Sequence, residues 1–368
     1  MDDPVADIEH MQAALALARR GLGNAWPNPA VGCVVVLAGR VVGRGWTAPG
    51  GRPHAEAMAL DLAGDQARGA TAYVTLEPCS HHGQTPPCAE ALVSAGIARV
   101  VVAMGDPDWR VDGQGLAVLR AAGIAVTEGV LEAAATAQQA GFLSRVKAGR
   151  PLVTLKLATS LDGRIATRAG ESQWITGPVA RRAAHALRGR HDAVMVGIGT
   201  VLADDPELTC RIPGYDKAKG LRVVVDSHLR TPLTHLVVKT SGVVPTWIMH
   251  RDDADADRQA AMADAGVRLF AVAPAGRSVD LAAVMQALGA AGLTRVLAEG
   301  GAGLAGGLLR TGLVDEVAWF HAPAIMGGDG LPAAEGFGVM ALADMARFRR
   351  VDQQETGVDM LTTFRRAA

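Results

Sequence analysis

Apolar residues recur with two different periods along the chain, and their order predicts alternating helices and strands. The first segment has apolar side chains three or four positions apart, which is helical spacing, at Ile8, Met11, Leu15, Ala18 and Leu22. We expect Asp7 to cap this helix and Gly23 to end it. Two valine-rich runs follow, 30–39 and 40–46, and they predict a hairpin of strands around Gly39.

The alternation continues through the rest of the first half. Helical patterns cover 53–64, 86–96 and 115–123, and strand patterns cover 71–78, 99–104 and 124–130. This order predicts a parallel or mixed sheet that is covered by helices. A further helix over 132–149 ends at a Gly-Arg-Pro break, where we place the boundary between a domain of residues 1–148 and one of residues 149–368.

The second half repeats the alternation with different sequence motifs. A strand at 151–159 runs into the polar turn "SLDG", and a helix over 178–190 follows it. Further strands are predicted at 191–200, 221–227, 243–250, 267–272, 294–301, 315–327 and 359–366. The chain is therefore predicted to be an α/β protein of two domains, each large enough to bury its own core.

Composition and charge exclude several classes of function. The 368 residues carry a net charge of −1 without a basic block, which argues against a nucleic-acid-binding protein. The acidic start lacks the features of a signal peptide, and no apolar run approaches the roughly 18 residues of a membrane span. Four cysteines in a chain of this length do not form a disulfide framework, so we expect a cytoplasmic protein without a membrane partner.

One short stretch, "LEPCSHHGQTPPCAEAL", concentrates reactive side chains. Cys79 is predicted where a strand ends and Cys88 where a helix begins, while His54 and Glu56 lie in the first turn of another helix. Helix N-termini lower thiol pKa values, which suits thiolate ligands. One imidazole and two thiolates make a three-ligand zinc site with a fourth position for water. Glu56 is then the general acid and base, in the arrangement that zinc nucleobase deaminases use.

Other interpretations of these residues remain open at this point. His81 or His82 would complete a structural four-ligand zinc site, although that arrangement leaves Glu56 without a role. Cys33 lies in an apolar strand and is expected in the core, and Cys210 is expected to be an inert loop cysteine.

Seven motifs spread over residues 27–309 carry a resemblance to a known family. They are "PNPAVGCVVV", "HAEAMAL", "LEPCSHHGQTPPC", "KLATSLDGRIA", "SQWITGPVARR", "GIGTVLADDPELTCR" and "EGGAGLAGGLL". The chain resembles the bifunctional riboflavin-biosynthesis proteins, which join a diaminohydroxyphosphoribosylaminopyrimidine deaminase to a 5-amino-6-(5-phosphoribosylamino)uracil reductase. The resemblance implies a cytidine-deaminase-like α/β/α sheet domain followed by a dihydrofolate-reductase-like α/β domain. It also implies one zinc ion per chain, held by His54, Cys79 and Cys88, with Glu56 as the proton carrier.

The same resemblance implies binding residues for both reactions. In the deaminase domain, Asn28 contacts the pyrimidine, while Gln84 stands where the family usually has Lys or Arg and leaves the partner of the substrate phosphate open. The residues implied for NADPH are Ala158, Trp174, Thr200, Asp204, Ser227 and the loop formed by Gly301, Ala302, Gly303, Leu304, Ala305, Gly306 and Gly307. The residues implied for the reductase substrate are Ser172, Arg188, Leu208, Arg211 and Glu299. The types suit their roles, because arginines bind phosphate with forked donors and a tryptophan offers a flat face to a ring.

These observations together predict a bifunctional enzyme acting on a small pyrimidine ribotide. The resemblance implies zinc-dependent deamination first, and then reduction of the ribosyl group to ribityl by NADPH. The family also implies a homodimer or higher homo-oligomer. The alternatives are a zinc deaminase for another nucleobase or nucleotide fused to a reductase-like domain, and a zinc-dependent structural or regulatory binding protein.

Overall fold

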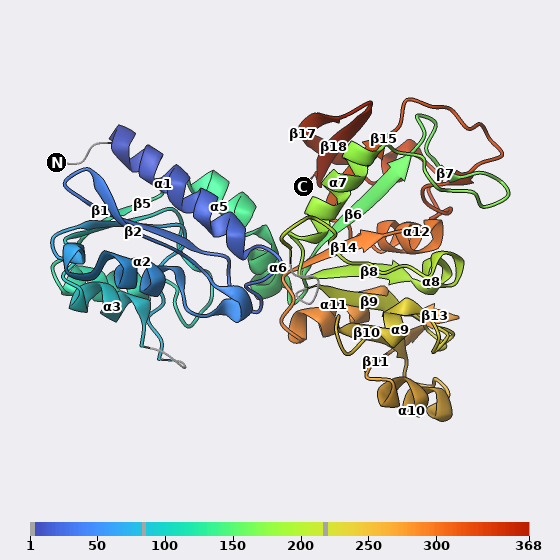
Figure 1. Cartoon of the computed structure of the whole chain (residues 1–368), viewed down its shortest axis with the longest axis horizontal. Coiled ribbons are helices and arrows are strands. Elements are labelled where there is room, and N and C mark those ends of the chain that lie inside the picture. Colours follow the sequence, from blue (N-terminus) through green and yellow to red (C-terminus); the bar gives the residue numbers. More distant parts are fainter. Residues whose placement is uncertain (1–3, 83–85, 216–219, 368) are drawn as a thin grey trace. The chain divides into compact units, whose positions relative to one another are not determined.

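The chain divides into two compact units, residues 1–149 and residues 150–368, which are described separately (Figure 1). The structure is a computed structural model, and it describes residues 4–82, 86–215 and 220–367. The sequence predicted the boundary between residues 148 and 149, and in the structure the boundary along the chain lies between residues 149 and 150.

A five-stranded mixed sheet forms the centre of unit 1. The order across the sheet is β2 (Arg40–Trp46), β1 (Gly32–Leu37), β3 (Thr71–Val74), β4 (Arg99–Val102) and β5 (Ala125–Glu128). β1 is antiparallel to β2 and β3, whereas β3, β4 and β5 are parallel. The predicted hairpin turns at Ala38 and Gly39, whose positive φ angles of 49° and 76° suit a two-residue hairpin connection.

Helices cover both faces of this sheet, which gives the predicted α/β/α arrangement. Helix α1 (Pro4–Ala18) lies on the opposite side of the sheet from α2 (Ala55–Ala63) and α3 (Cys88–Ser94) (Figure 1). Two glycines allow the helices to approach closely. A Cβ on Gly32 would lie 2.0 Å from the Ala14 carbonyl oxygen of α1, and one on Gly45 would lie 2.0 Å from the Ala55 oxygen of α2. The remaining helices of unit 1 are α4 (Gln114–Ala121), α5 (Glu132–Gln138) and α6 (Ala140–Ala148).

Two local predictions in unit 1 are wrong for tertiary reasons. Asp7 does not cap α1 but lies inside it, buried, where it accepts hydrogen bonds from Arg99 and Tyr73. The helix predicted over 132–149 is two helices that meet at Gln139. The buried Gln139 side chain donates a 2.8 Å hydrogen bond to the Ala30 carbonyl oxygen.

Unit 2 is built on a nine-stranded sheet that is parallel except at one edge. The order is β11 (Arg268–Val272), β10 (Thr246–Arg251), β9 (Leu221–Val225), β8 (Ala193–Gly197), β14 (Arg295–Glu299), β6 (Leu152–Thr159), β15 (Glu316–His321), β18 (Asp359–Arg366) and β17 (Phe348–Thr356). Only β18 and β17 are antiparallel to their neighbours. Two small pairs lie outside this sheet, β7 (Arg164–Ala166) with β16 (Leu331–Pro332) and β12 (Pro274–Ala275) with β13 (Ser278–Val279).

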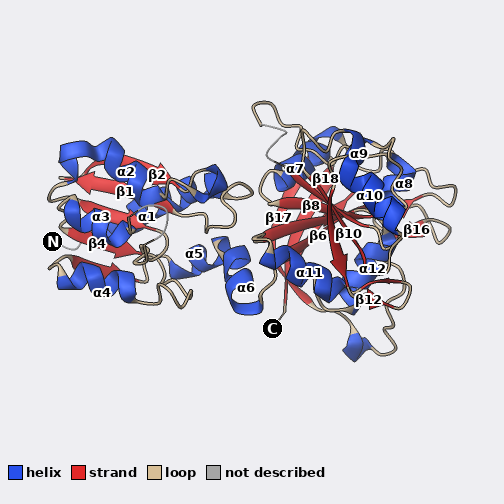
Figure 2. Ribbon diagram, turned by 90° about the horizontal axis from the view of Figure 1, so that it is seen from below, coloured by secondary structure: helices blue, strands red, loops and turns tan. Residues whose placement is uncertain are grey.

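Helices cover both faces of this sheet as well (Figure 2). On one face lie α7 (Pro178–Arg188), α8 (Ile198–Asp204), α9 (Leu236–Lys239) and α10 (Ala256–Asp264), which contribute to two clusters of buried apolar side chains. On the other face lie α11 (Leu281–Ala290) and α12 (Ala302–Arg310). Short 3-10 turns complete the described elements at Arg19–Gly21, Pro49–Gly51, Gly64–Ala67 and Leu342–Asp344.

The parallel strands place several predicted site residues at one edge of unit 2. Glu299 is the last residue of β14, Thr200 lies in α8 directly after β8, and Ser227 lies two residues beyond β9. In open α/β sheets, ligands bind at the carboxyl ends of the strands, so this edge is where we expect a cofactor.

Candidate functional site

A cluster of one histidine and two cysteines lies where two helices of unit 1 begin. His54 immediately precedes α2, and Cys88 is the first residue of α3. The His54 Nδ1 atom lies 3.3 Å from the Cys88 sulfur and 3.6 Å from the Cys79 sulfur. The donor atoms of all three residues lie within 4.8 Å of one another. One nitrogen and two sulfurs at this spacing form a donor set that suits zinc.

The electrostatics of the cluster favour a bound cation. Hydrogen bonds from Cys88 and His54 lower the pKa of the Cys79 thiol to about 4, although burial by itself raises this pKa. The hydrogen bond to Cys79 and burial raise the pKa of Cys88. A coordinated metal ion would deprotonate the second thiol as well. The residues therefore fit the zinc that the sequence predicts.

Glu56 lies beside this cluster on the first turn of α2. Its side chain is almost fully buried, and burial, followed by the charge of Cys79, raises its pKa to about 7. A carboxyl group with a pKa near neutrality can both take up and release a proton, which suits a general acid and base.

A hollow of about 250 Å³ opens onto the cluster. It is lined by Asn28, His54, Glu56 and Cys79, among other residues. Asn28 Nδ2 donates to the Gly51 carbonyl oxygen at 2.9 Å and lies 3.4 Å from His54 Nε2, so Asn28 borders the His54 ring. Gln84 lies outside the described residues.

The structure shows where the residues of the alternative four-ligand zinc site lie, and where the two other cysteines lie. Among the described side chains, neither His81 nor His82 joins the group of donor atoms, and the exposed His82 lies 3.7 Å from Glu90. Cys33 is buried in the core of unit 1. Cys210 is also buried, and its thiol donates to the His185 carbonyl oxygen at 3.1 Å.

One structural residue of this site was missed by the sequence analysis. The buried Glu77 accepts hydrogen bonds from the backbone N–H groups of Asp106, Gly113, Gly115 and Leu116. It thereby holds the start of α4 and the loop before it, and this loop contributes Asp106, Asp108 and Arg110 to the hollow. The only local signal was an acidic residue at the end of an apolar strand.

In unit 2, two predicted substrate residues form a buried ion pair. Arg188 at the end of α7 donates from Nε and Nη2 to the two carboxylate oxygens of Glu299, at 2.7 and 2.9 Å. Burial opposes ionisation of Glu299, but the charge and hydrogen bonds of Arg188 prevail and lower the pKa of Glu299 to about 2. Lys156, which the sequence analysis missed, lies opposite Glu299 on β6, and burial lowers its pKa. A lone lysine within an apolar strand was the available signal.

The other predicted substrate residues lie on two loops of unit 2. Leu208 is buried with a φ of 55°, and the exposed Arg211 pairs with Glu207 at 3.3 Å. Ser172 lies in the segment between β7 and α7. In the same segment, Trp174 is 65% exposed, and the Arg181 guanidinium lies 4.5 Å from the centre of its ring.

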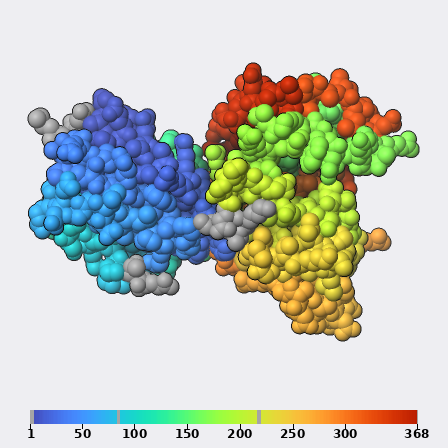
Figure 3. All heavy atoms as spheres, viewed as in Figure 1, coloured from blue at the N-terminus to red at the C-terminus, as the bar shows by residue number. Residues whose placement is uncertain are grey.

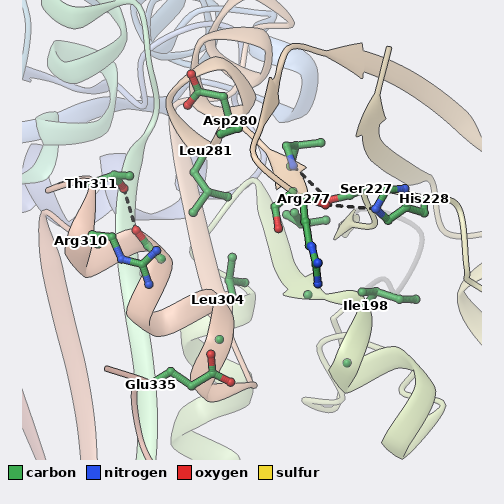
Figure 4. A pocket seen from close by; sticks show the side chains of 18 of the residues that line it. Ile198, Ser227, His228, Arg277, Asp280, Leu281, Leu304, Arg310, Thr311 and Glu335 are labelled. Carbon is green, nitrogen blue, oxygen red and sulfur yellow. Dashed lines mark hydrogen bonds between the residues drawn. The ribbon is translucent and has the colours of Figure 1, made fainter. Parts of the chain in front are cut away.

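A second hollow, of about 510 Å³, lies at the carboxyl ends of β8 and β9 (Figure 4). Four of the predicted cofactor residues line it, namely Ser227, Gly303, Leu304 and Gly307. Residues that the sequence analysis missed also line it, among them His228, Arg277, Asp280, Arg310 and Glu335. The hollow has the size of a cofactor site.

The Gly-rich segment is not the loop that the sequence predicted. Helix α12 begins at Ala302, so the residues from Ala302 to Gly307 are helical, and Ala305 and Gly306 are buried. Only Gly300 and Gly301 have positive φ angles, 75° and 60°. A Cβ on Gly300 would lie 2.7 Å from Thr200 Oγ1, so Thr200 of α8 closes over this turn. A helix N-terminus preceded by two glycines fits the diphosphate of NADPH.

The remaining predicted cofactor residues lie around this edge of the sheet. Ala158 is in β6, Asp204 ends α8, and burial raises the pKa of Asp204. Neither residue is among those lining the 510 Å³ hollow.

Comparison with known proteins identifies the two domains. Residues 4–104 match the model of the cytidine and deoxycytidylate deaminase zinc-binding region, and residues 151–362 match the RibD C-terminal domain. The riboflavin biosynthesis protein RibD of Escherichia coli is 41% identical over 365 residues, covering 96% of this chain and 98% of the relative. The Bacillus amyloliquefaciens protein of the same name is 40% identical, with coverages of 96% and 95%.

The chain belongs to the RibD family. A solved RibD structure from Acinetobacter baumannii matches all of both chains at 38% identity and a TM-score of 0.89. A Thermotoga maritima structure, described as a diaminohydroxyphosphoribosylaminopyrimidine deaminase/5-amino-6-(5-phosphoribosylamino)uracil reductase, covers 99% of each chain at 32% identity and a TM-score of 0.87. Like the RibD family, this chain is a bifunctional zinc-dependent deaminase and NADPH-dependent reductase of riboflavin biosynthesis, and the predicted two-domain α/β fold is confirmed.

Proposed function

We propose that the chain deaminates 2,5-diamino-6-(5-phosphoribosylamino)pyrimidin-4(3H)-one and then reduces the ribosyl group of 5-amino-6-(5-phosphoribosylamino)uracil to ribityl. Residues 1–148 carry out the first step, and residues 149–368 carry out the second with NADPH. The observation that carries the proposal is the cluster of His54, Cys79 and Cys88 with Glu56 buried beside it. The activities in the description of the Thermotoga maritima structure support the choice of substrates.

In the deaminase site, His54, Cys79 and Cys88 hold the zinc ion. When bound, zinc lowers the pKa of a water molecule and so supplies a nucleophile at neutral pH. Glu56 takes up the proton released from the water and delivers it to the leaving amine, which its raised pKa allows. Asn28 contacts the pyrimidine with its amide group, and the hydrogen bond from its nitrogen to the Gly51 carbonyl oxygen fixes the orientation of the side chain.

In the reductase site, NADPH supplies a hydride when bound. The turn at Gly301 and the first turn of α12 hold its diphosphate, with Thr200 and Ser227 on either side. Trp174 offers a flat face to one of the rings of NADPH, while Ala158 and Asp204 border the cofactor. Glu299 accepts from ribose hydroxyl groups, since Arg188 keeps it ionised. Ser172, Leu208 and the exposed Arg211 complete the substrate site, with Arg211 toward the phosphate.

We further propose that the protein is a homodimer or higher homo-oligomer in the cytoplasm. The β17 edge of the unit 2 sheet supports self-association, because nearly all of its residues are exposed. In Figure 3 the last part of the chain, coloured red, forms an outer surface of unit 2. The four cysteines are free thiols, which suits a reducing compartment. Among the described helices, none has the length and apolar character needed to cross a membrane.

Mass spectrometry of the products tests the proposed substrates. The diaminopyrimidine ribotide, incubated with the zinc-loaded chain alone, should take up water and release ammonia, a net exchange of NH for O. Addition of NADPH should convert that product to a species heavier by two hydrogens. Reduction without prior deamination would contradict the proposed order, and no turnover of this ribotide would contradict the proposed substrate.

A further inference from the structure

The lining of the hollow at the ends of β8 and β9 contains three arginines and two acidic side chains, Asp280 and Glu335. The arginines are Arg230, Arg277 and Arg310. Arg310 belongs to the last turn of α12 and donates to the Gly336 carbonyl oxygen at 3.4 Å. Within the described part of the chain, no hydrogen bond or ion pair involves the guanidinium of Arg230 or of Arg277.

Arg277 differs from Arg230 in the way its backbone is held. It lies with Gly276 in the turn between β12 and β13, and Gly276 has a φ of 62°. Three hydrogen bonds fix this turn. His228 Nε2 donates to the Arg277 carbonyl oxygen at 3.1 Å, and Arg251 Nη1 donates to that of Gly276 at 2.7 Å. The third bond joins the Val279 N–H to Ser227 Oγ at 3.0 Å.

These bonds place the Arg277 side chain beside Ser227 at the wall of the hollow (Figure 4). Because the Ser227 oxygen accepts from Val279, its own proton remains available to donate to a ligand. A hydroxyl donor and a guanidinium with forked donors form a pair that suits a phosphate group.

The acidic side chains near this hollow are not placed to bind the unphosphorylated ribose of NADH. A carboxylate that accepts from the ribose 2′-hydroxyl is the usual mark of an NADH site. Asp226, which follows β9 directly, is fully buried and accepts from the Thr231 N–H and hydroxyl at 2.7 and 2.8 Å. Asp280 lines the hollow but caps α11, where it accepts from the Ala282 N–H at 2.8 Å. Glu335 lies at the other end of the hollow, next to Gly303.

We propose that Arg277 selects NADPH over NADH by binding the 2′-phosphate of the cofactor together with Ser227. The proposal rests on the NADPH-dependent reduction and goes beyond it by naming the residue that distinguishes the two cofactors. The 2′-phosphate is the only group by which they differ, so its partner determines the preference.

Equilibrium binding to the full-length chain tests this assignment independently of turnover. The probes are NADPH, NADH, adenosine 2′,5′-bisphosphate and 5′-AMP, titrated by calorimetry into wild type, Arg277→Gln and Arg230→Gln. Loss of one charge-assisted contact should weaken binding of Arg277→Gln to NADPH and to the bisphosphate by about tenfold to a hundredfold. NADH and 5′-AMP should bind within about twofold of wild type. Arg40→Gln, which removes an exposed arginine of unit 1, is the matched control and should leave all four affinities unchanged.

Salt dependence and a conservative variant provide further readouts. The preference of wild type for NADPH should decline as ionic strength rises, and this dependence should be weaker in Arg277→Gln, because salt screens an exposed charge pair. Arg277→Lys should recover part of the NADPH affinity. Unchanged affinity for NADH and 5′-AMP in each variant shows that the cofactor site of unit 2 is folded.

Three results would overturn the proposal. Equal weakening of NADPH and NADH in Arg277→Gln would mean that Arg277 supports the whole cofactor site. Unchanged NADPH affinity would place the 2′-phosphate elsewhere. A selective loss of NADPH affinity in Arg230→Gln alone would show that Arg230, and not Arg277, binds the 2′-phosphate. If wild type bound neither dinucleotide, the cofactor site itself would be misplaced, which is a different result from a lost preference.

Discussion

Single residues of the unit 1 site have different chemical roles. Substitution of Cys88 tests metal binding separately from proton transfer. Serine offers an oxygen that replaces a thiolate poorly on zinc, so Cys88→Ser should lose the ion. Elemental analysis of the purified variant should show well below one zinc per chain. Cys210→Ser changes a buried thiol in unit 2 that has no place in the cluster, and it should retain the metal. Full zinc occupancy in Cys88→Ser would contradict the ligand assignment.

Glu56 should be needed for proton transfer but not for metal binding. Glu56→Gln preserves the shape of the side chain and removes its ability to carry a proton. Deamination should fall by a factor on the order of 10²–10⁴, the typical contribution of a positioned acid or base. Zinc content should stay near that of wild type, and reduction of the deaminated substrate should be unaffected. Loss of zinc from this variant would show instead that Glu56 is a ligand.

His191 should make the stability of unit 2 depend on pH. Burial lowers the pKa of His191 to about 4, and the neutral ring donates to the Leu187 carbonyl oxygen while it accepts from the Thr154 hydroxyl. The unfolded chain binds a proton at this residue below about pH 6.5, whereas the folded chain resists doing so. The free energy of unfolding should therefore fall as pH decreases from about 6.5 to about 4, by up to roughly 3 kcal/mol from this residue.

Urea unfolding at pH 7 and pH 5 measures that contribution. His191→Gln should lower stability at pH 7, since it disrupts buried hydrogen bonds, but it should lose less stability than wild type between the two pH values. The exposed His82→Gln should behave as wild type does at both. A variant His191→Gln with the full pH dependence of wild type would assign the effect to other groups.

At the scale of elements, we expect the turn between β14 and α12 to control access of the cofactor to the helix N-terminus. Gly301 has a φ of 60°, and a Cβ there would lie 3.2 Å from Thr200 Oγ1. Gly301→Ala should strain the turn by about 1 kcal/mol or more and shift Thr200. We expect the KM for NADPH to rise severalfold, with deamination unchanged.

Gly242→Ala is the matched control for this turn. Gly242 is exposed, a Cβ there would meet no atom within 4 Å, and its φ is not positive. The Gly242→Ala variant should have an unchanged KM for NADPH. Equal effects of the two alanines would indicate that the Gly301 turn has no special relation to the cofactor.

At the scale of the whole molecule, the two units should work independently. Each has its own sheet and its own buried core. Residues 1–149 expressed alone should bind zinc and deaminate the diaminopyrimidine ribotide, and residues 150–368 expressed alone should reduce the deaminated product. Assay of each half against the intact chain measures this. A folded half without activity would mean that its site needs residues from the other half.

The sequence by itself determined the α/β order, the two-domain organisation and the chemistry of the deaminase cluster. These features follow from local patterns. His54 and Cys88 precede or begin helices whose first turns are recognisable in the sequence, and residue type alone shows that one imidazole and two thiols suit zinc. The Gly-rich segment was recognised for the same reason, although its helix begins earlier than expected, at Ala302.

Only the tertiary structure decided which distant side chains meet. Asp7 has the appearance of a helix cap, yet it binds Arg99, which lies 92 positions away. Arg188 and Glu299 neutralise each other across 111 positions, and the Arg277 turn is held by His228 from another strand end. The physical reason is that such contacts depend on strand order and on the face of the sheet to which a side chain points. Strand order leaves no trace in the sequence around these residues, and strands that are buried on both faces have no alternating pattern that would show the face.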